Sequence, residues 1–128
     1  MLFIIGFGEI FRKDKNENIE YGDVVCIRED GLVHKVNTEH DLNTIIGICS
    51  DTIGIGLGGK DIPESEQVEV EMLGQIWVKV NDDNISKGDL VKVLSNGTVT
   101  KTIDKNLRFG IAISNIQNNK IRIVYNCC

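Results

Sequence analysis

Three residues of the sequence have side chains suited to nucleophilic catalysis: Cys26, His34 and His40. A cysteine and a histidine base form a common catalytic pair, which usually works beside a helix N-terminus. No long stretch of this chain repeats apolar residues at helical spacing. We therefore interpret Cys26 as a small buried hydrophobe, His34 as a residue on a strand surface and His40 as part of a solvated turn.

A glycine-rich segment, Gly54–Lys60, matches the first part of a phosphate-binding loop. That loop needs a Ser or Thr next to hold magnesium, whereas Asp61 follows here, and its charge repels phosphate. We predict a connecting loop instead. The following acidic residues are compatible with a calcium site, but also with an exposed loop and edge strand: Glu64, Glu66, Glu69 and Glu71. No histidine and cysteine spacing fits a zinc motif, so we expect neither metal nor cofactor.

Composition limits the class of protein. A chain of 128 residues with 41% hydrophobic content suits one domain spanning 1–128. The formal net charge of −5 argues against nucleic acid as a partner. No apolar run is long enough to cross a bilayer, so we expect no membrane partner, and the opening residues 1–5 are too short for a secretion signal.

Short apolar runs separated by glycine-containing turns occupy most of the chain. Asp30-Gly31 lies between two such runs and predicts a hairpin. Alternation over 68–80 predicts two strand stretches joined at Gly74, with Glu69 and Glu71 facing water. The other expected strands are 24–28, 32–36, 44–49, 90–94, 98–101, 109–113 and 120–125.

An internal repeat relates residues 21–48 to residues 87–111. Both segments contain a Gly-Asp strand start, an Asp-Gly or Asn-Gly turn and an apolar run around a glycine, at offsets of 66, 66 and 63 residues. We predict one hairpin unit used twice, with the open edges of the two units pairing about a pseudo-twofold axis. The expected fold is all-β, a small barrel or sandwich with little or no helix.

These ordered blocks resemble the C-terminal β-domain of phage tail-spike, tail-fibre and pre-neck appendage proteins. That group includes the autoproteolytic intramolecular-chaperone domains called peptidase G2. The turn pattern also resembles small phage capsid decoration, or cement, proteins. The matching segments are 8–11, 22–25, 46–50, 56–59, 74–80 and 86–90.

The resemblance implies a structural protein that is made in the bacterial cytoplasm and resides in the virion. Its partners would be copies of itself, in a homotrimer, and other virion proteins. The first expectation is an assembly module, chaperone-like, of a tail spike or tail fibre. A capsid decoration protein and an autoproteolytic processing domain are the alternatives.

The resemblance also identifies a candidate catalytic residue, Glu9. Autoproteolytic members cut a Ser-Asp bond just before the opening motif, but the matching positions here are Ile5 and Gly6. Glu9 matches the motif glutamate, which would assist cleavage or make a buried hydrogen bond. Ser50-Asp51 falls in another block and is interpreted as a turn. Any activity would therefore be self-cleavage upstream of the domain, and a metabolic enzyme is not expected.

Three consecutive apolar residues on a predicted strand suggest an interface: Ile76, Trp77 and Val78. Successive side chains of a strand point to opposite faces, so one face needs cover from outside the chain's own core. Trp77 is expected to contact a neighbouring subunit, because tryptophan anchors interfaces well. Packing of Trp77 inside the monomer is the alternative.

Overall fold

The computed structural model describes residues 6–50, 63–82 and 84–126 of the chain. Within them lie nine strands and three short 3-10 turns but no α-helix, which confirms the all-β prediction. The strands are β1 (Gly6–Arg12), β2 (Val24–Ile27), β3 (Val33–Lys35), β4 (Ile45–Cys49), β5 (Gln67–Lys79), β6 (Leu90–Val93), β7 (Val99–Lys101), β8 (Gly110–Ala112) and β9 (Lys120–Asn126). The turns are η1 (His40–Thr44), η2 (Glu64–Glu66) and η3 (Lys105–Leu107).

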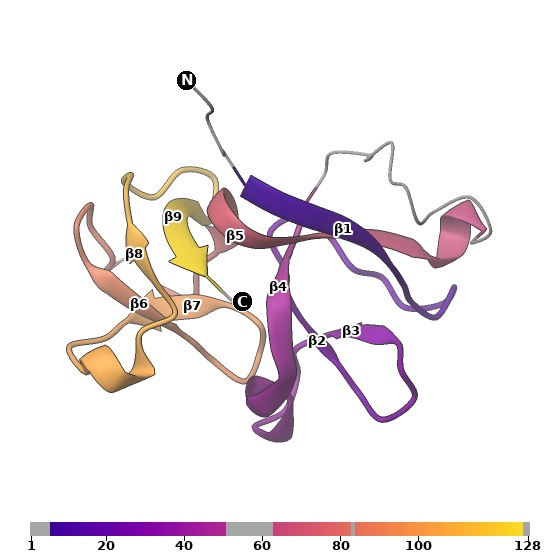
Figure 1. Cartoon of the computed structure of the whole chain (residues 1–128). Coiled ribbons are helices and arrows are strands. Elements are labelled where there is room, and N and C mark those ends of the chain that lie inside the picture. The colour runs from indigo at the N-terminus through magenta and orange to yellow at the C-terminus, as the bar shows by residue number, and fades with distance from the viewer. Residues whose placement is uncertain (1–5, 51–62, 83, 127–128) are drawn as a thin grey trace.

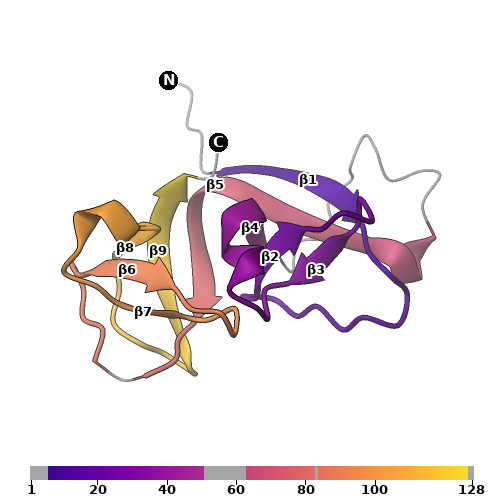
Figure 2. The same cartoon turned by 90° about the horizontal axis from the view of Figure 1, so that it is seen from below.

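The strands form one antiparallel sheet that curls into a half-barrel (Figure 1). Their order is β3-β2-β4-β5-β9-β8-β6-β7, and β1 pairs with the other edge of β5. The first half of β5 pairs with β1 and β4, and the second half pairs with β9. This long strand therefore joins the two halves of the molecule, which Figure 2 shows side by side.

The strand β5 runs unbroken for 13 residues rather than as two stretches. Gly74 adopts a φ of 115° in its middle, a conformation open to glycine, so the strand bends there without ending. Val68 and Val70 are buried as predicted, but Glu69 and Glu71 are half-buried rather than facing water freely. Burial raises the pKa of Glu71, and the neighbouring Glu69 carboxylate adds to that shift.

Two three-stranded units share one pattern of strand pairing. The first unit (residues 22–49) has the order β3-β2-β4, and the second unit (residues 88–112) has the order β7-β6-β8. In the first, the Gly22 amide donates to the carbonyl of Cys49 at 3.0 Å. In the second, the Gly88 amide donates to the carbonyl of Ala112 at 2.8 Å.

The turns of the two units also correspond. One carboxylate oxygen of Asp23 accepts from the Glu20 amide at 2.8 Å, and Asp89 accepts from the Ser86 amide at the same distance. The hairpin turns carry glycines in left-handed conformations, at positions 31 and 97, with φ of 77° and 82°. These shared contacts are the physical counterpart of the repeated sequence blocks.

The two units pack face to back. The small core of the first unit contains Val25, Val33 and Cys49, on the face away from the second unit. Their counterparts in the second unit, Val91, Val99 and Ala112, lie in the main core between the units. Equivalent faces therefore do not meet, and the expected pseudo-twofold closure does not form, because a twofold axis would bring equivalent faces together.

Candidate assembly surface

The three residues considered for nucleophilic catalysis do not form a catalytic group. The Cys26 thiol is buried, and its sulfur lies 3.5 Å from the backbone carbonyl oxygen of His34, not from the imidazole. Burial raises the pKa of Cys26 to about 11. His40 is exposed at the start of η1, which agrees with its interpretation as part of a solvated turn. The thiol therefore has no imidazole base beside it.

His34 was predicted to lie on a strand surface. The structure instead buries it, with 8% of the residue exposed. Its ring lies between two carboxylates: Nδ1 is 2.6 Å from Glu17 Oε1, and Nε2 is 2.8 Å from Asp30 Oδ2. The contact fastens the segment before β2 to the β2–β3 hairpin, so His34 has a structural role here.

A second ion pair ties the same hairpin to η1. The Arg28 guanidinium donates through Nε and Nη2 to the two carboxylate oxygens of Asp41, at 3.1 and 3.0 Å. Asp41 is 2% exposed and also accepts from the amides of Asn37 and Thr38. The Arg28 guanidinium holds the pKa of the Asp41 carboxyl well below its usual range.

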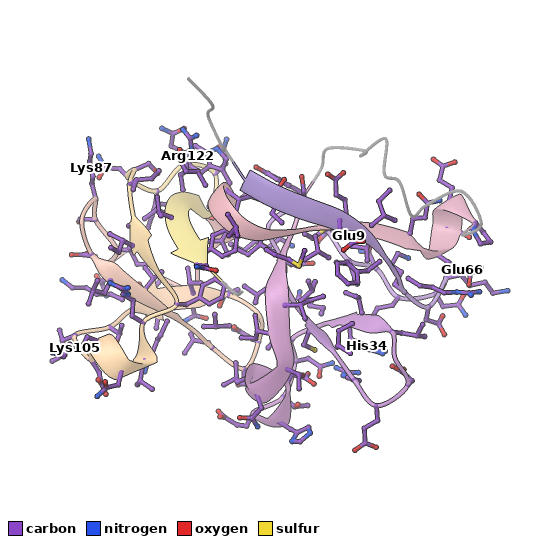
Figure 3. All side chains as sticks on the ribbon, viewed as in Figure 1. Glu9, His34, Glu66, Lys87, Lys105 and Arg122 are labelled. Carbon is purple, nitrogen blue, oxygen red and sulfur yellow. The ribbon has the colours of Figure 1, made fainter. Side chains whose placement is uncertain are left out.

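Glu9 is exposed on β1, opposite Val70, so the buried hydrogen bond expected of it is not present (Figure 3). Among the described residues, none forms an ion pair or hydrogen bond with its carboxylate. The other positions considered for cleavage or phosphate binding lie outside the described residues: Ile5, Asp51, the segment Gly54–Lys60 and Asp61. Glu9 thus stands away from any nucleophile that the structure places.

Within the described part of the chain, no three His, Cys, Asp or Glu residues are grouped to hold a metal ion. The same described part contains no helix that is long and apolar enough to cross a membrane. Cys26 and Cys49 are buried, while Cys127 and Cys128 lie outside the described residues. The geometry that remains to be explained is a surface.

The predicted interface strand divides its side chains between two faces. Ile76 and Val78 are 6% and 0% exposed and belong to the main core of the protomer itself. Trp77 is half-buried on the opposite face of β5, across from Arg122 of β9. Of the three residues, only Trp77 is therefore placed to reach a neighbouring subunit, and that role stays a prediction.

An apolar row crosses the same outer face of the second half of the sheet. Leu90 of β6 pairs with Ile111 of β8, which pairs with Val124 of β9. Directly paired residues project from one face of the sheet. Gln75 of β5 is opposite Val124, and Trp77, two residues further along β5, projects from the same face. Val124 is 41% exposed, and the other three are half-buried. We call Trp77, Leu90, Ile111 and Val124 the open face.

The repeat shows what this face does in the first unit. Val24 and Ile48 hold the positions that correspond to Leu90 and Ile111, and both are 0% exposed in the main core. The second unit covers them. Leu90 and Ile111 are only half-buried among the described residues, so the open face is the counterpart of a surface that packs against another unit.

Charge is distributed unevenly along the chain. Residues 1–79 contain 7 basic and 15 acidic side chains, whereas residues 80–128 contain 7 basic and 4 acidic ones. Figure 3 shows Lys87, Lys105 and Arg122 on one half of the molecule, and Glu9 and Glu66 on the other. The half that carries the open face is therefore basic, and the other half is acidic.

Known proteins share this fold. A family model described as the XM1 gp53 minor capsid protein matches residues 7–123. The C-terminal fragment of gene product 12 of bacteriophage phi29 has a TM-score of 0.65 and 19% identity, covering 94% of this chain and 99% of that one. The pre-mature phi29 gene product 12 has a TM-score of 0.66 and 17% identity, and the aligned region covers 96% of this chain but only 21% of that one.

A third similar structure is the N base of the phi29 head fiber gp8.5, with a TM-score of 0.55 and 19% identity. The aligned region covers 94% of this chain and 96% of that one. None of the curated proteins matches the sequence. At these identities the solved structures show a shared fold and no more.

Proposed function

Because the chain belongs to the XM1 gp53 minor capsid protein family and is thus a structural protein of a bacteriophage virion, we propose that it works as a homotrimer through its open face. Each copy covers the Trp77, Leu90, Ile111 and Val124 side chains of a neighbour. The trimer is an assembly module that holds three copies in register for other virion proteins to join. No catalytic step is part of this function.

The open face carries the proposal. An apolar row across three paired strands is the pattern of a sheet surface that packs against another layer. In the first unit, Val24 and Ile48, the counterparts of Leu90 and Ile111, are packed at 0% exposure in the main core. The same sequence pattern, left uncovered in the second unit, fits a surface that is covered only on association.

A location on the head is favoured over the tail location that the sequence resemblance placed first. The family description refers to a minor capsid protein, and one similar fold is the base of a head fiber. Both descriptions refer to the phage head. A base that trimerises there would give a longer fibre a threefold starting point, which is the chaperone-like role of the proposal.

The test is the mass of the protein in solution, measured by sedimentation equilibrium over a wide concentration range. We expect three times the 14.2 kDa of one chain. Val124→Glu puts a charge on the open face at an already exposed position, so it should leave the protomer folded and weaken the trimer by about a hundredfold or more. Trp77→Ser should act in the same direction.

Ile10→Ser is the matched control, because Ile10 is a half-buried apolar residue on β1, in the other half of the molecule. It should leave the trimer mass unchanged. A wild-type chain that stays monomeric at every concentration refutes the proposal. So does a trimer that Val124→Glu and Ile10→Ser disturb equally.

A further inference from the structure

The turn η3 and the segment just before it carry exposed apolar side chains. Leu107 is 53% exposed, and Ile103 just before the turn is 95% exposed. Leu42 is the third residue of η1, as Leu107 is of η3, and the two amides bond alike, to Glu39 and Asp104. Yet Leu42 packs against the main core. Leu107 instead borders the groove between the two units with more than half of the residue exposed.

Leu42 lies at a groove on the second unit. The groove holds about 490 Å³ and lies beside Val93 and Leu94 of the second unit. Leu42 and Ile45 of the first unit border one side, and Leu107 and Arg108 border it from the η3 segment. The first unit thus places its 3-10 turn against the hairpin of the second. This contact is part of the face-to-back packing of the two units.

The corresponding hollow on the first unit is open. It holds about 600 Å³ beside Ile27, which corresponds to Val93, and all of its lining comes from residues 27–44 of the first unit itself. Glu29 and Asp30 stand at its hairpin side, and His40 and Thr44 at its η1 side. The groove of the second unit is bordered by the 3-10 turn η1 of the first unit, whereas no turn of another unit within the described residues borders this hollow.

Charge favours the η3 turn as the occupant. Lys105 and Arg108 flank Leu107, both are exposed, and neither forms an ion pair with a described residue. Glu29 is exposed beside the hollow and likewise forms no ion pair with a described residue. Two cations and a leucine on the η3 side would therefore complement Glu29 and Ile27 at the hollow, where the cation Arg28 is already paired with Asp41.

We propose that the η3 turn of one copy docks into the hollow between the β2–β3 turn and η1 of the next copy, with Leu107 on Ile27 and Arg108 facing Glu29. This inference rests on the proposed homotrimer and specifies its contact. The contact joins two different surfaces, as the closed ring of a trimer requires. It repeats between chains the packing that the two units make within one chain.

A charge-swap experiment tests the contact. Arg108→Glu should weaken the trimer about tenfold or more in sedimentation equilibrium, and Glu29→Arg should do the same. The double variant, in which both charges are exchanged, should regain most of the wild-type association constant. Leu107→Ser should weaken association without changing thermal unfolding at concentrations where wild type and variant are both monomeric, because its side chain is already exposed.

Lys87→Glu is the matched control, with the same charge change at an exposed lysine that Figure 3 places away from Lys105. It should leave association within about twofold of wild type. A wild-type trimer that responds equally to Lys87→Glu and Arg108→Glu, or that the double variant does not restore, overturns this contact and leaves the open-face trimer standing. A monomeric wild type removes both.

Discussion

Replacing Gly47 by alanine should strongly destabilise the fold. Gly47 lies in β4 where that strand passes β5, and a Cβ atom there would stand 2.1 Å from the carbonyl oxygen of Glu71. It would also meet a methyl group of Val70 at 2.8 Å. The obstacle is mainly backbone of a paired strand, so no rotamer change relieves it.

The size of the effect follows from the distance. Carbon and oxygen atoms of neighbouring strands approach to about 3.3 Å, so β4 and β5 would have to separate by about 1 Å. Such overpacking costs about 1–3 kcal/mol. The separation also strains ladder hydrogen bonds such as Ser50 N to Glu69 O at 2.9 Å, each worth about 1 kcal/mol. The expected loss is about 4 kcal/mol, or about 15 °C in Tm.

The measurement is urea unfolding followed by circular dichroism, with a thermal scan alongside. All variants are compared at one protein concentration, because association adds to apparent stability. The control is Gly31→Ala. Gly31 has a φ of 77°, but a Cβ atom there would meet no other atom within 4 Å, so alanine should cost only the backbone penalty of about 1 kcal/mol.

A Gly47→Ala protein that loses no more stability than Gly31→Ala would refute the close approach of β4 to β5. A much larger loss in Gly47→Ala than in Gly31→Ala, with the denaturant slope unchanged, supports the close approach.

Three further outcomes are expected. Asp41→Asn should lower the free energy of unfolding at pH 7 by about 3 kcal/mol, because it breaks a buried ion pair. The depressed pKa of Asp41 means that this stabilisation is present above about pH 4, the unfolded value, and is lost as the pH falls further, so wild type and variant should converge in acid titrations. Asp23→Ala removes a 1%-exposed carboxylate, whereas its counterpart Asp89 has a 21%-exposed side chain. In urea unfolding, Asp23→Ala should lower the free energy of unfolding by about 3 kcal/mol and Asp89→Ala by about 1 kcal/mol. Equal losses would contradict this difference in burial. A variant that keeps only the Cys26 thiol should resist disulfide reagents at pH 8 until denaturant is added, and rapid labelling of the folded protein would show that the thiol is not buried.

The turns and strands of the repeat could be read from the sequence because each depends on local chemistry. Asp30-Gly31 and its counterpart at Asn96-Gly97 supply the left-handed glycine that a tight hairpin needs. Two missed features depend on distant partners. The strand β1 has no interpretable alternation of its own and exists by pairing with β5, from Gly6 opposite Gly74 to Arg12 opposite Gln67. His34 is buried because Glu17, far from it in sequence, faces its ring.

The candidate surface was predicted in part. A run of three apolar residues indicated that one side of β5 would be left over, but not that Ile76 and Val78 would be the covered side. Leu90, Ile111 and Val124 gave no such signal, since each is an ordinary apolar residue in its own strand. They become one surface only through the pairing of β6, β8 and β9.

Local sequence, then, determined where the chain turns, where it extends and that one turn-and-strand unit is used twice. Tertiary structure alone decided which face of each unit is buried. A strand with apolar residues on both faces can bury either face, so the sequence pattern does not determine which face lies in the core. In this protein the choice was made by face-to-back stacking, which buries Val24 and Ile48 of the first unit and leaves Leu90 and Ile111 of the second without a layer over them.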